Sequence, residues 1–233
     1  TRAKIFLKLT FEEILAMKSE NGRSMVEMLG VLAIIGVLSV GAISGYSKAM
    51  FKYKLNKHTE QMNTVINAVA RHAHSFDNIQ HRDSLIPYFI KMGEIPTEMV
   101  STNDGYYIFD VFRQAWYIRI EGGAIVLASM YDVGSSFLSS FLSSNSPENL
   151  AICQNTLNIA KENADNIDTI VIYTANSGSA NNKFEYILGD KLCTAEYMQY
   201  DKCLKNLTLN DVHTLCTEQL KNGYGLFQLS WEQ

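Results

Sequence analysis

The sequence predicts an α+β fold: a long N-terminal helix, half membrane-spanning and half amphipathic, packed on a small antiparallel sheet with additional helices. Three observations lead to this prediction. Residues 28–47 carry no charge, and a helical stripe of apolar residues follows them. Segments with strand character then come in pairs separated by helical segments. That order is typical of an antiparallel sheet with helices on one side.

Length and composition fit one ordinary domain with an anchor. The chain has 233 residues, of which 47% are hydrophobic and 19% charged, so disorder is not expected. The net charge of −4 provides no basic field, and no nucleic-acid partner is predicted. Because residue 1 is Thr rather than Met, we expect the reading frame to begin upstream.

The uncharged segment at residues 28–47 has the length of a membrane span. As a helix its twenty residues measure about 30 Å, the thickness of a bilayer's hydrocarbon core. A cleaved secretory signal is the first alternative, but its apolar stretch is normally shorter and its cleavage site lies beyond that stretch. Here a feature resembling a processing site precedes the apolar run, which favours an anchor.

That feature is the hexapeptide GRSMVE, from Gly22 to Glu27. A carboxylate at the edge of an apolar helix is costly in lipid unless it is paired, so Glu27 either pairs or is solvated among the headgroups. Gly-x-x-x-x-Glu followed by an apolar run resembles the prepilin cleavage and methylation motif of type IV pilins and type II secretion pseudopilins. The long leader resembles that of the type IVb branch.

The resemblance assigns a role to three residues. It implies that prepilin peptidase cuts between Gly22 and Arg23, that the new terminal amine of Arg23 is N-methylated, and that Glu27 neutralises the terminal amine of a neighbouring subunit. Opposite charges buried in an apolar bundle must pair, and the pairing fixes the axial register between subunits. The chain departs from the family at Arg23, where a hydrophobic residue is usual, and lacks the mid-span proline.

By this resemblance the chain divides into four parts with the lollipop arrangement of pilins. They are a prepilin leader at 1–22, a transmembrane and assembly helix at 23–47, its amphipathic continuation at 48–80 and a globular α+β head at 81–233. The implied partners are copies of the same chain, prepilin peptidase, the inner-membrane assembly machinery and membrane lipid before assembly. The implied location is the bacterial inner membrane with the head in the periplasm, then a pilus or pseudopilus.

Beyond the span, apolar residues recur at alternating steps of four and three, as on one helix face. The members of this stripe are Leu55, Thr59, Met62, Ile66, Val69, Ala73 and Phe76. No Gly or Pro interrupts residues 46–86, so one helix of about 50 residues is predicted from Ser24 to about residue 75. A membrane anchor with a coiled-coil stalk is the alternative that the stripe leaves open.

No catalytic or cofactor-binding motif was found, so we predict neither enzymatic activity, nor a cofactor, nor a metal site. The histidines near the helix lack the i, i+4 spacing of a helical metal site and are expected to be solvated or to cap the helix. These are His58, His72, His74 and His81.

The remaining residues predict the strands and helices of the head. Alternating or apolar segments indicate five strands, at residues 116–120, 124–130, 168–174, 183–188 and 226–231. The sequence EGG at 121–123 is a hairpin signal. Helices are predicted from Ser146 to about residue 164 and over 209–221, with a shorter one at 195–205. The serine-rich run at 135–146 is expected to form a solvated loop.

All four cysteines lie in the head: Cys153, Cys193, Cys203 and Cys216. An even number indicates two disulfides if the compartment is oxidising, whereas four buried free thiols are the alternative. In the pilins that the chain resembles, a helix Cys joins a Cys near the C-terminal strand. The resemblance therefore implies Cys153 with Cys216, which leaves Cys193 with Cys203.

The resemblance implies that the chain is a non-enzymatic structural subunit of a type IV pilus-like filament. A minor pilin or a type II secretion pseudopilin is the alternative within the same family. A membrane-anchored exported binding protein or enzyme without a filament role is the alternative outside it.

Overall fold

The computed structural model describes the backbone of residues 2–76, 83–100, 105–131, 147–176, 183–194, 202–221 and 223–232. The chain divides into two compact units, Thr1–Lys52 and Tyr53–Gln233, and we call the second the head unit. The predicted serine-rich loop, the residues around His81 and most of the predicted helix at 195–205 lie outside the described residues.

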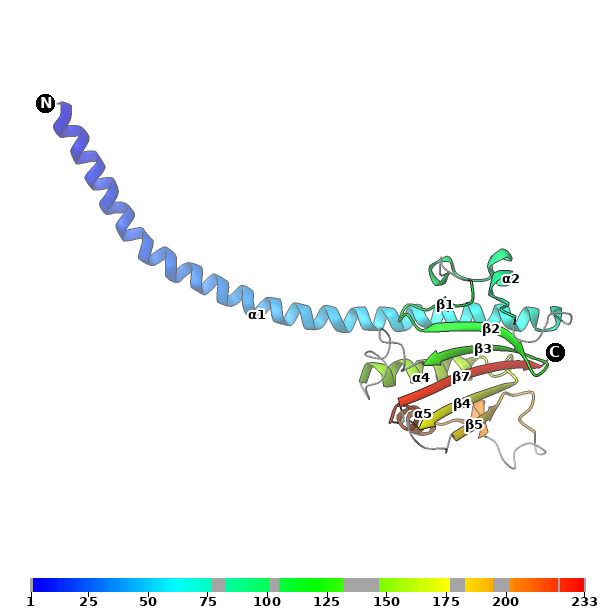
Figure 1. Ribbon diagram of the computed structural model, residues 1–233. Helices are drawn as coiled ribbons and strands as arrows, with labels where there is room; N and C mark the ends of the chain where they lie inside the picture. The colour runs from blue at the N-terminus through cyan, green and yellow to red at the C-terminus, as the bar shows by residue number, and fades with distance from the viewer. Residues whose placement is uncertain are drawn as a thin grey trace. The chain divides into compact units, whose positions relative to one another are not determined.

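The described elements follow the predicted order of a long helix, strands, helix, strands, helix and strand (Figure 1). They are α1 (Arg2–His72), η1 (Ala73–Ser75), α2 (Ile86–Lys91), η2 (Thr97–Met99), β1 (Ile108–Phe109), β2 (Ala115–Glu121), β3 (Ala124–Tyr131), α4 (Pro147–Glu162), β4 (Thr169–Asn176), β5 (Lys183–Leu188), β6 (Lys202–Cys203), η3 (Leu204–Asn206), α5 (Leu209–Lys221) and β7 (Gly223–Glu232). The predicted α+β class is confirmed.

The long helix α1 begins earlier than predicted. It runs without interruption from Arg2 to His72, whereas the predicted start was Ser24. The first 24 residues contain no proline and many strong helix formers. The single glycine among them, Gly22, destabilises the helix by only about 1 kcal/mol, so it does not end the helix. The predicted end is confirmed, because the helix passes into a 3-10 turn in which His74 has non-helical backbone angles.

The described residues form a sheet of seven strands in the order β1-β2-β3-β7-β4-β5-β6. All neighbours are antiparallel except β5 and β6. The predicted hairpin between β2 and β3 is confirmed, and both of its glycines have positive φ angles, which a side chain disfavours. β7 is paired on both edges, to β3 and β4, so the last strand in the sequence lies in the middle of the sheet.

Two short strands were not predicted from the sequence. β1 and β6 are two residues long, too short for an alternation pattern to show. The predicted short helix at 195–205 is wrong where the structure describes it. There Lys202 and Cys203 pair with β5 and are followed by a 3-10 turn, because the sheet and the Cys193–Cys203 disulfide fix this segment in an extended form.

One face of the sheet carries the core of the head unit. Alternate residues of the strands, such as Trp116, Leu127 and Leu229, are buried with residues of α1, α2, α4 and α5 in a single cluster. The predicted stripe on α1 supplies its share, since Met62, Ile66 and Val69 are fully buried. The helices therefore lie on one side of the sheet, as predicted.

Gly189, just after β5, lies against the backbone of the turn after α4. A Cβ atom there would lie 1.6 Å from the carbonyl oxygen of Ile167, and hydrogen bonds from Gly189 N to Asp168 O (2.8 Å) and from Asp190 N to Ala164 O (2.7 Å) hold the two segments together. We expect Gly189→Ala to lower the free energy of unfolding by about 2–3 kcal/mol because the backbone must move, as measured by urea denaturation. Gly45→Ala, where a Cβ meets nothing, is the matched control. Equal stability of the two variants would contradict the close approach.

Candidate functional site

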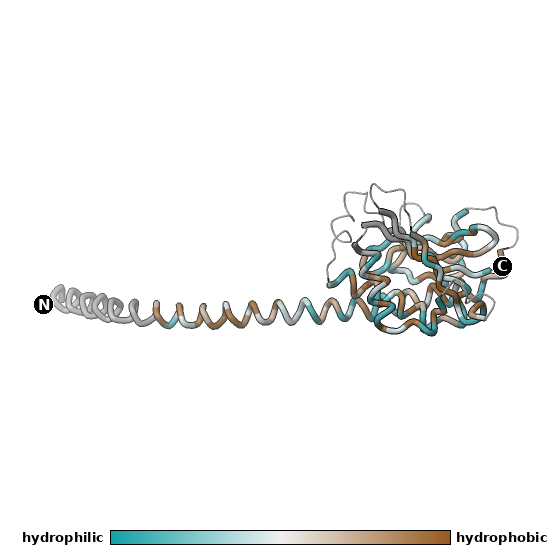
Figure 2. Tube along the Cα trace, turned by 90° about the horizontal axis from the view of Figure 1, so that it is seen from below, coloured by the Kyte–Doolittle hydropathy of each residue, from teal (hydrophilic) through white to brown (hydrophobic). Residues whose placement is uncertain are grey.

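The apolar part of α1 exposes large hydrophobic side chains on every side. Twelve such residues between Met25 and Ile43 are each more than half exposed, and they fall on all faces of the helix because many are consecutive in the sequence. Figure 2 shows this run as the brown stretch of the long helix. Among the described residues, α1 holds the one helix long and apolar enough to cross a membrane. A surface of this kind is covered by lipid or by protein.

The predicted processing residues lie inside α1. Gly22 and Arg23 are part of its continuous backbone, and their side chains lie outside the described part. Glu27 is exposed on the first turn of the fully described helix. The cleavage, methylation and assembly roles of the three residues stay predictions.

Within the head unit, a buried carboxylate joins the sheet to α1. Asp110 has a fully buried side chain. Its Oδ1 accepts hydrogen bonds from Phe112 N (2.8 Å) and Gln114 N (2.9 Å), and its Oδ2 accepts one from Trp116 Nε1 (3.1 Å). The turn that these bonds close contains Arg113 with a φ of 66°, a left-handed conformation rare for a residue other than glycine.

His58 brings α1 to the same carboxylate. Its side chain is 0% exposed, and its Nε2 lies 3.3 Å from Asp110 Oδ2, although the geometry falls short of a hydrogen bond. On the other side of the ring, Nδ1 is 3.0 Å from Asn155 Nδ2 of α4. An amide nitrogen only donates, so Nδ1 accepts and the ring proton is on Nε2, facing Asp110. We call His58, Asp110, Trp116 and Asn155 the Asp110 network.

Two more contacts join α1 to the elements of this network. Gln61, also buried, accepts a hydrogen bond from Val111 N at 2.9 Å. Thr59 accepts one from Asn155 Nδ2 at 3.1 Å, which accounts for the one polar residue in the predicted apolar stripe. The head unit therefore fixes α1 through polar as well as apolar contacts.

The prediction that His58 is solvated or caps the helix is wrong. The buried side of α1 is wider than the stripe and includes Gln61, Val65 and Ala68. His58 precedes Met62 by four residues and Val65 by seven, so helical spacing alone places it on that side. This spacing is the signal in the sequence that indicates burial. Of the other histidines, His72 is half-buried and His74 is exposed.

Ion pairs add a more exposed set of contacts between α1 and the segment after α2. Lys57 Nζ lies 2.9 Å from Glu98 Oε1, and Glu94 contacts both His72 and Arg71. Hydrogen bonds from His72, and then from Arg71, hold the pKa of Glu94 below its ordinary value. Lys57 likewise lowers the pKa of Glu98. Because these groups are partly open to solvent, the pairs add little stability.

The Asp110 network gives a direct test. We expect Asp110→Ala to lower the free energy of unfolding by about 3–5 kcal/mol, because buried N–H donors lose their acceptor and His58 loses its partner. Urea denaturation of the full chain followed by tryptophan fluorescence measures the change. Asp165→Ala, at an exposed carboxylate, should stay within about 0.5 kcal/mol of wild type. An unchanged unfolding midpoint in Asp110→Ala would show that the network does not hold the head unit together.

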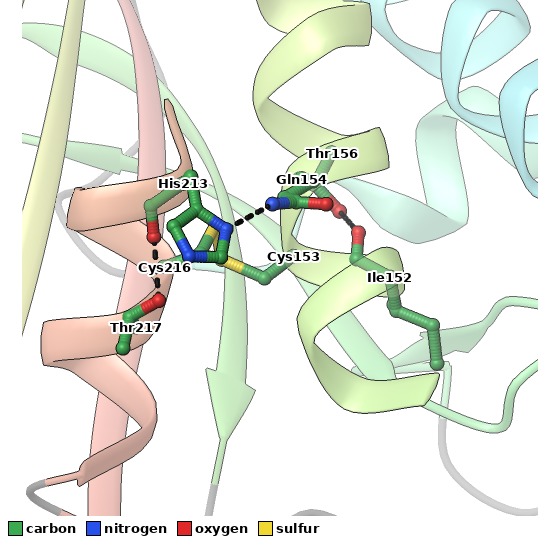
Figure 3. Close-up of a disulfide and its surroundings, with 7 residues drawn as sticks. All are labelled: Ile152, Cys153, Gln154, Thr156, His213, Cys216 and Thr217. Atoms are coloured by element: carbon green, nitrogen blue, oxygen red, sulfur yellow. Dashed lines mark hydrogen bonds between the residues drawn. A yellow bond between two sulfur atoms is a disulfide. The ribbon is translucent and has the colours of Figure 1, made fainter. Parts of the chain in front are cut away.

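A disulfide joins the two later helices under the sheet. Cys153 of α4 is bonded to Cys216 of α5, with a Cα–Cα distance of 5.8 Å (Figure 3). Beside it, Gln154 Nε2 lies 3.0 Å from His213 Nδ1, so a polar contact joins the same two helix turns. Both sulfur-bearing residues are buried in the core. The structure pairs Cys193 with Cys203 as well, and both pairs are those that the resemblance implies.

The two disulfides differ in the length of chain that they close. The separations are 63 residues for Cys153–Cys216 and 10 residues for Cys193–Cys203. In the chain-entropy model these loops correspond to about 4 and 3 kcal/mol. We expect the double alanine variant of the first pair to lose more stability than that of the second, since the first also loses buried contacts. Thermal unfolding under non-reducing conditions measures both variants. The reverse order would contradict the assignment of the first pair as the main covalent constraint.

No protein-family model matches the chain, and no curated protein or solved structure is detectably similar to it. The part of the chain that the structure describes contains no group of three or more His, Cys, Asp and Glu residues placed to hold a metal ion. The candidate site is therefore the exposed apolar helix with its preceding hexapeptide.

Proposed function

We propose that the chain is a structural subunit of a type IV pilus-like filament, cut by prepilin peptidase after Gly22 and assembled through residues 23–47. The observation that carries the proposal is an apolar part of α1, exposed on all sides, whose first residues overlap the end of the hexapeptide GRSMVE. A membrane anchor alone explains the apolar helix. The hexapeptide adds the processing signal and a carboxylate at the edge of the span.

The apolar helix is stabilised both by lipid and by packing against other copies of itself. Covering its dozen large side chains stabilises the covered state by on the order of 20 kcal/mol relative to water. Lipid tails and packed copies of the helix offer similar apolar cover, so hydrophobicity alone does not drive the helix from the membrane into a filament. A specific polar contact must select the filament, and Glu27 is the residue placed to make it.

Processing creates a positive charge close to Glu27. Cutting after Gly22 leaves an ammonium group on Arg23, about 6 Å along the helix axis from Glu27. In an apolar bundle, both charges require a counter-charge. Arg23 adds a guanidinium one turn from the same carboxylate, so it either strengthens the pairing or competes with the amine of the neighbouring subunit.

Gly22 is also the weakest point of the helix around the cut. Glycine is about 1 kcal/mol less favourable than alanine in a helix, so local unwinding costs less there. The continuous α1 backbone before processing is therefore compatible with cleavage there. The disulfides fit an exported head in an oxidising compartment, and we propose a periplasmic head without enzymatic activity.

The proposal is tested by mass spectrometry and filament yield in a host with a type IV assembly system. The mature protein should begin at Arg23, with or without one methyl group. Gly22→Leu should keep the leader and remain in the membrane. Glu27→Gln should be cut normally, yet its filament yield after shearing should fall by roughly tenfold or more, because the amine loses its counter-charge.

The matched control is Glu162→Gln at an exposed carboxylate of the head unit, which should assemble as wild type. An intact leader on the wild-type protein, or normal filaments from Glu27→Gln, would falsify the proposal. The amount of protein in the sheared fraction distinguishes a main pilin from the alternatives in the same family. A main pilin dominates that fraction, whereas a minor pilin or pseudopilin stays with the envelope.

A further inference from the structure

We infer that a band at residues 46–54 of α1 binds the anionic headgroups of the bilayer surface on the side of the span that leads to the head unit. The band consists of Tyr46, Lys48, Lys52, Tyr53 and Lys54, all exposed. The inference rests on the membrane-spanning part of the proposed function and is independent of filament assembly.

The first argument is the distribution of these side chains around the helix. Lys48 and Lys52 are one turn apart and share a side. Lys54 projects about 120–160° away from them, and the two tyrosines, seven residues apart, occupy a third side. The tyrosine side chains are 67% and 60% exposed. A single protein partner contacts one side of a helix, whereas a headgroup layer surrounds it.

The second argument is charge. Between Glu27 and Glu60 the sequence contains no Asp or Glu, so no carboxylate lies within a turn of these three lysines on their own helix. Lys57, one turn further on, is different because it pairs with Glu60 and Glu98. The band therefore presents cations without a counter-charge from α1, and phosphate groups of anionic lipids complement it.

The third argument is position along the helix. The uncharged span ends at Ser47, directly before the first lysine of the band, and Lys48 to Lys54 covers about 9 Å of helix axis. The headgroup layer of one leaflet is about 5–8 Å thick, and lysine side chains extend to reach it. Tyrosines with an apolar ring and a polar hydroxyl concentrate at this depth. The band thus fixes the depth at which α1 stays in the bilayer before assembly.

The experiment uses the full chain reconstituted in phosphatidylcholine vesicles that contain trace spin-labelled phosphatidylglycerol or spin-labelled phosphatidylcholine. The fraction of motionally restricted lipid gives the preference of the helix for the anionic headgroup. We expect a preference of about twofold or more at low salt, which falls toward one at high salt. Replacing Lys48, Lys52 and Lys54 by Gln should abolish the preference, and replacing them by Arg should keep it.

The matched control removes the same charge from exposed lysines of the head unit, as Lys91→Gln, Lys191→Gln and Lys202→Gln, and should keep the preference. A ratio of one in the wild type, or an unchanged ratio in the band variant, would overturn the inference. Resistance to alkaline extraction is measured first on every sample. A chain that fails this step refutes the membrane span and with it the proposed function, whereas an inserted chain without lipid preference refutes the band alone.

Discussion

The buried carboxylate of Asp110 is the constraint on which the arrangement of the head unit depends. It closes the turn before β2, accepts a hydrogen bond from Trp116 in the core and faces His58 of α1, which in turn contacts α4. Apolar packing is tolerant of small sliding movements, whereas a buried carboxyl group that accepts several hydrogen bonds is satisfied in one geometry only. The network therefore sets the register of α1 on the sheet, and the apolar stripe supplies most of the stability.

The sequence predicts those elements whose pattern is long enough to repeat. The strand at 116–120 alternates over five residues, and the α5 helix matches its predicted bounds of 209–221 because its apolar stripe and flanking residues agree. β1 and β6 escape prediction because two residues cannot alternate. Their positions depend on strands far away in the chain, as for Cys203, which is held by β5 and by Cys193. The early start of α1 was not predicted either. No residue before Ser24 forbids a helix, so the sequence gives no signal of where this helix begins.

The site residues, too, can be predicted from the sequence only in part. The hexapeptide and the span are contiguous, so the sequence alone indicates them. The Asp110 network joins residues that are 52 and 97 positions apart, His58 to Asp110 and His58 to Asn155. Each of these residues is ordinary by itself, and their meeting follows from the packing of α1 and α4 on one face of the sheet. Spacing could have indicated that His58 is buried, but it could not have indicated its partner.

The central place of β7 has a consequence for the order in which the head unit is made. Among the strands that the structure describes, β1, β2 and β3 form one group, β4, β5 and β6 form another, and β7 alone pairs with both. Until residue 232 has left the ribosome and reached its final compartment, each group presents an unpaired edge, a hazard for aggregation.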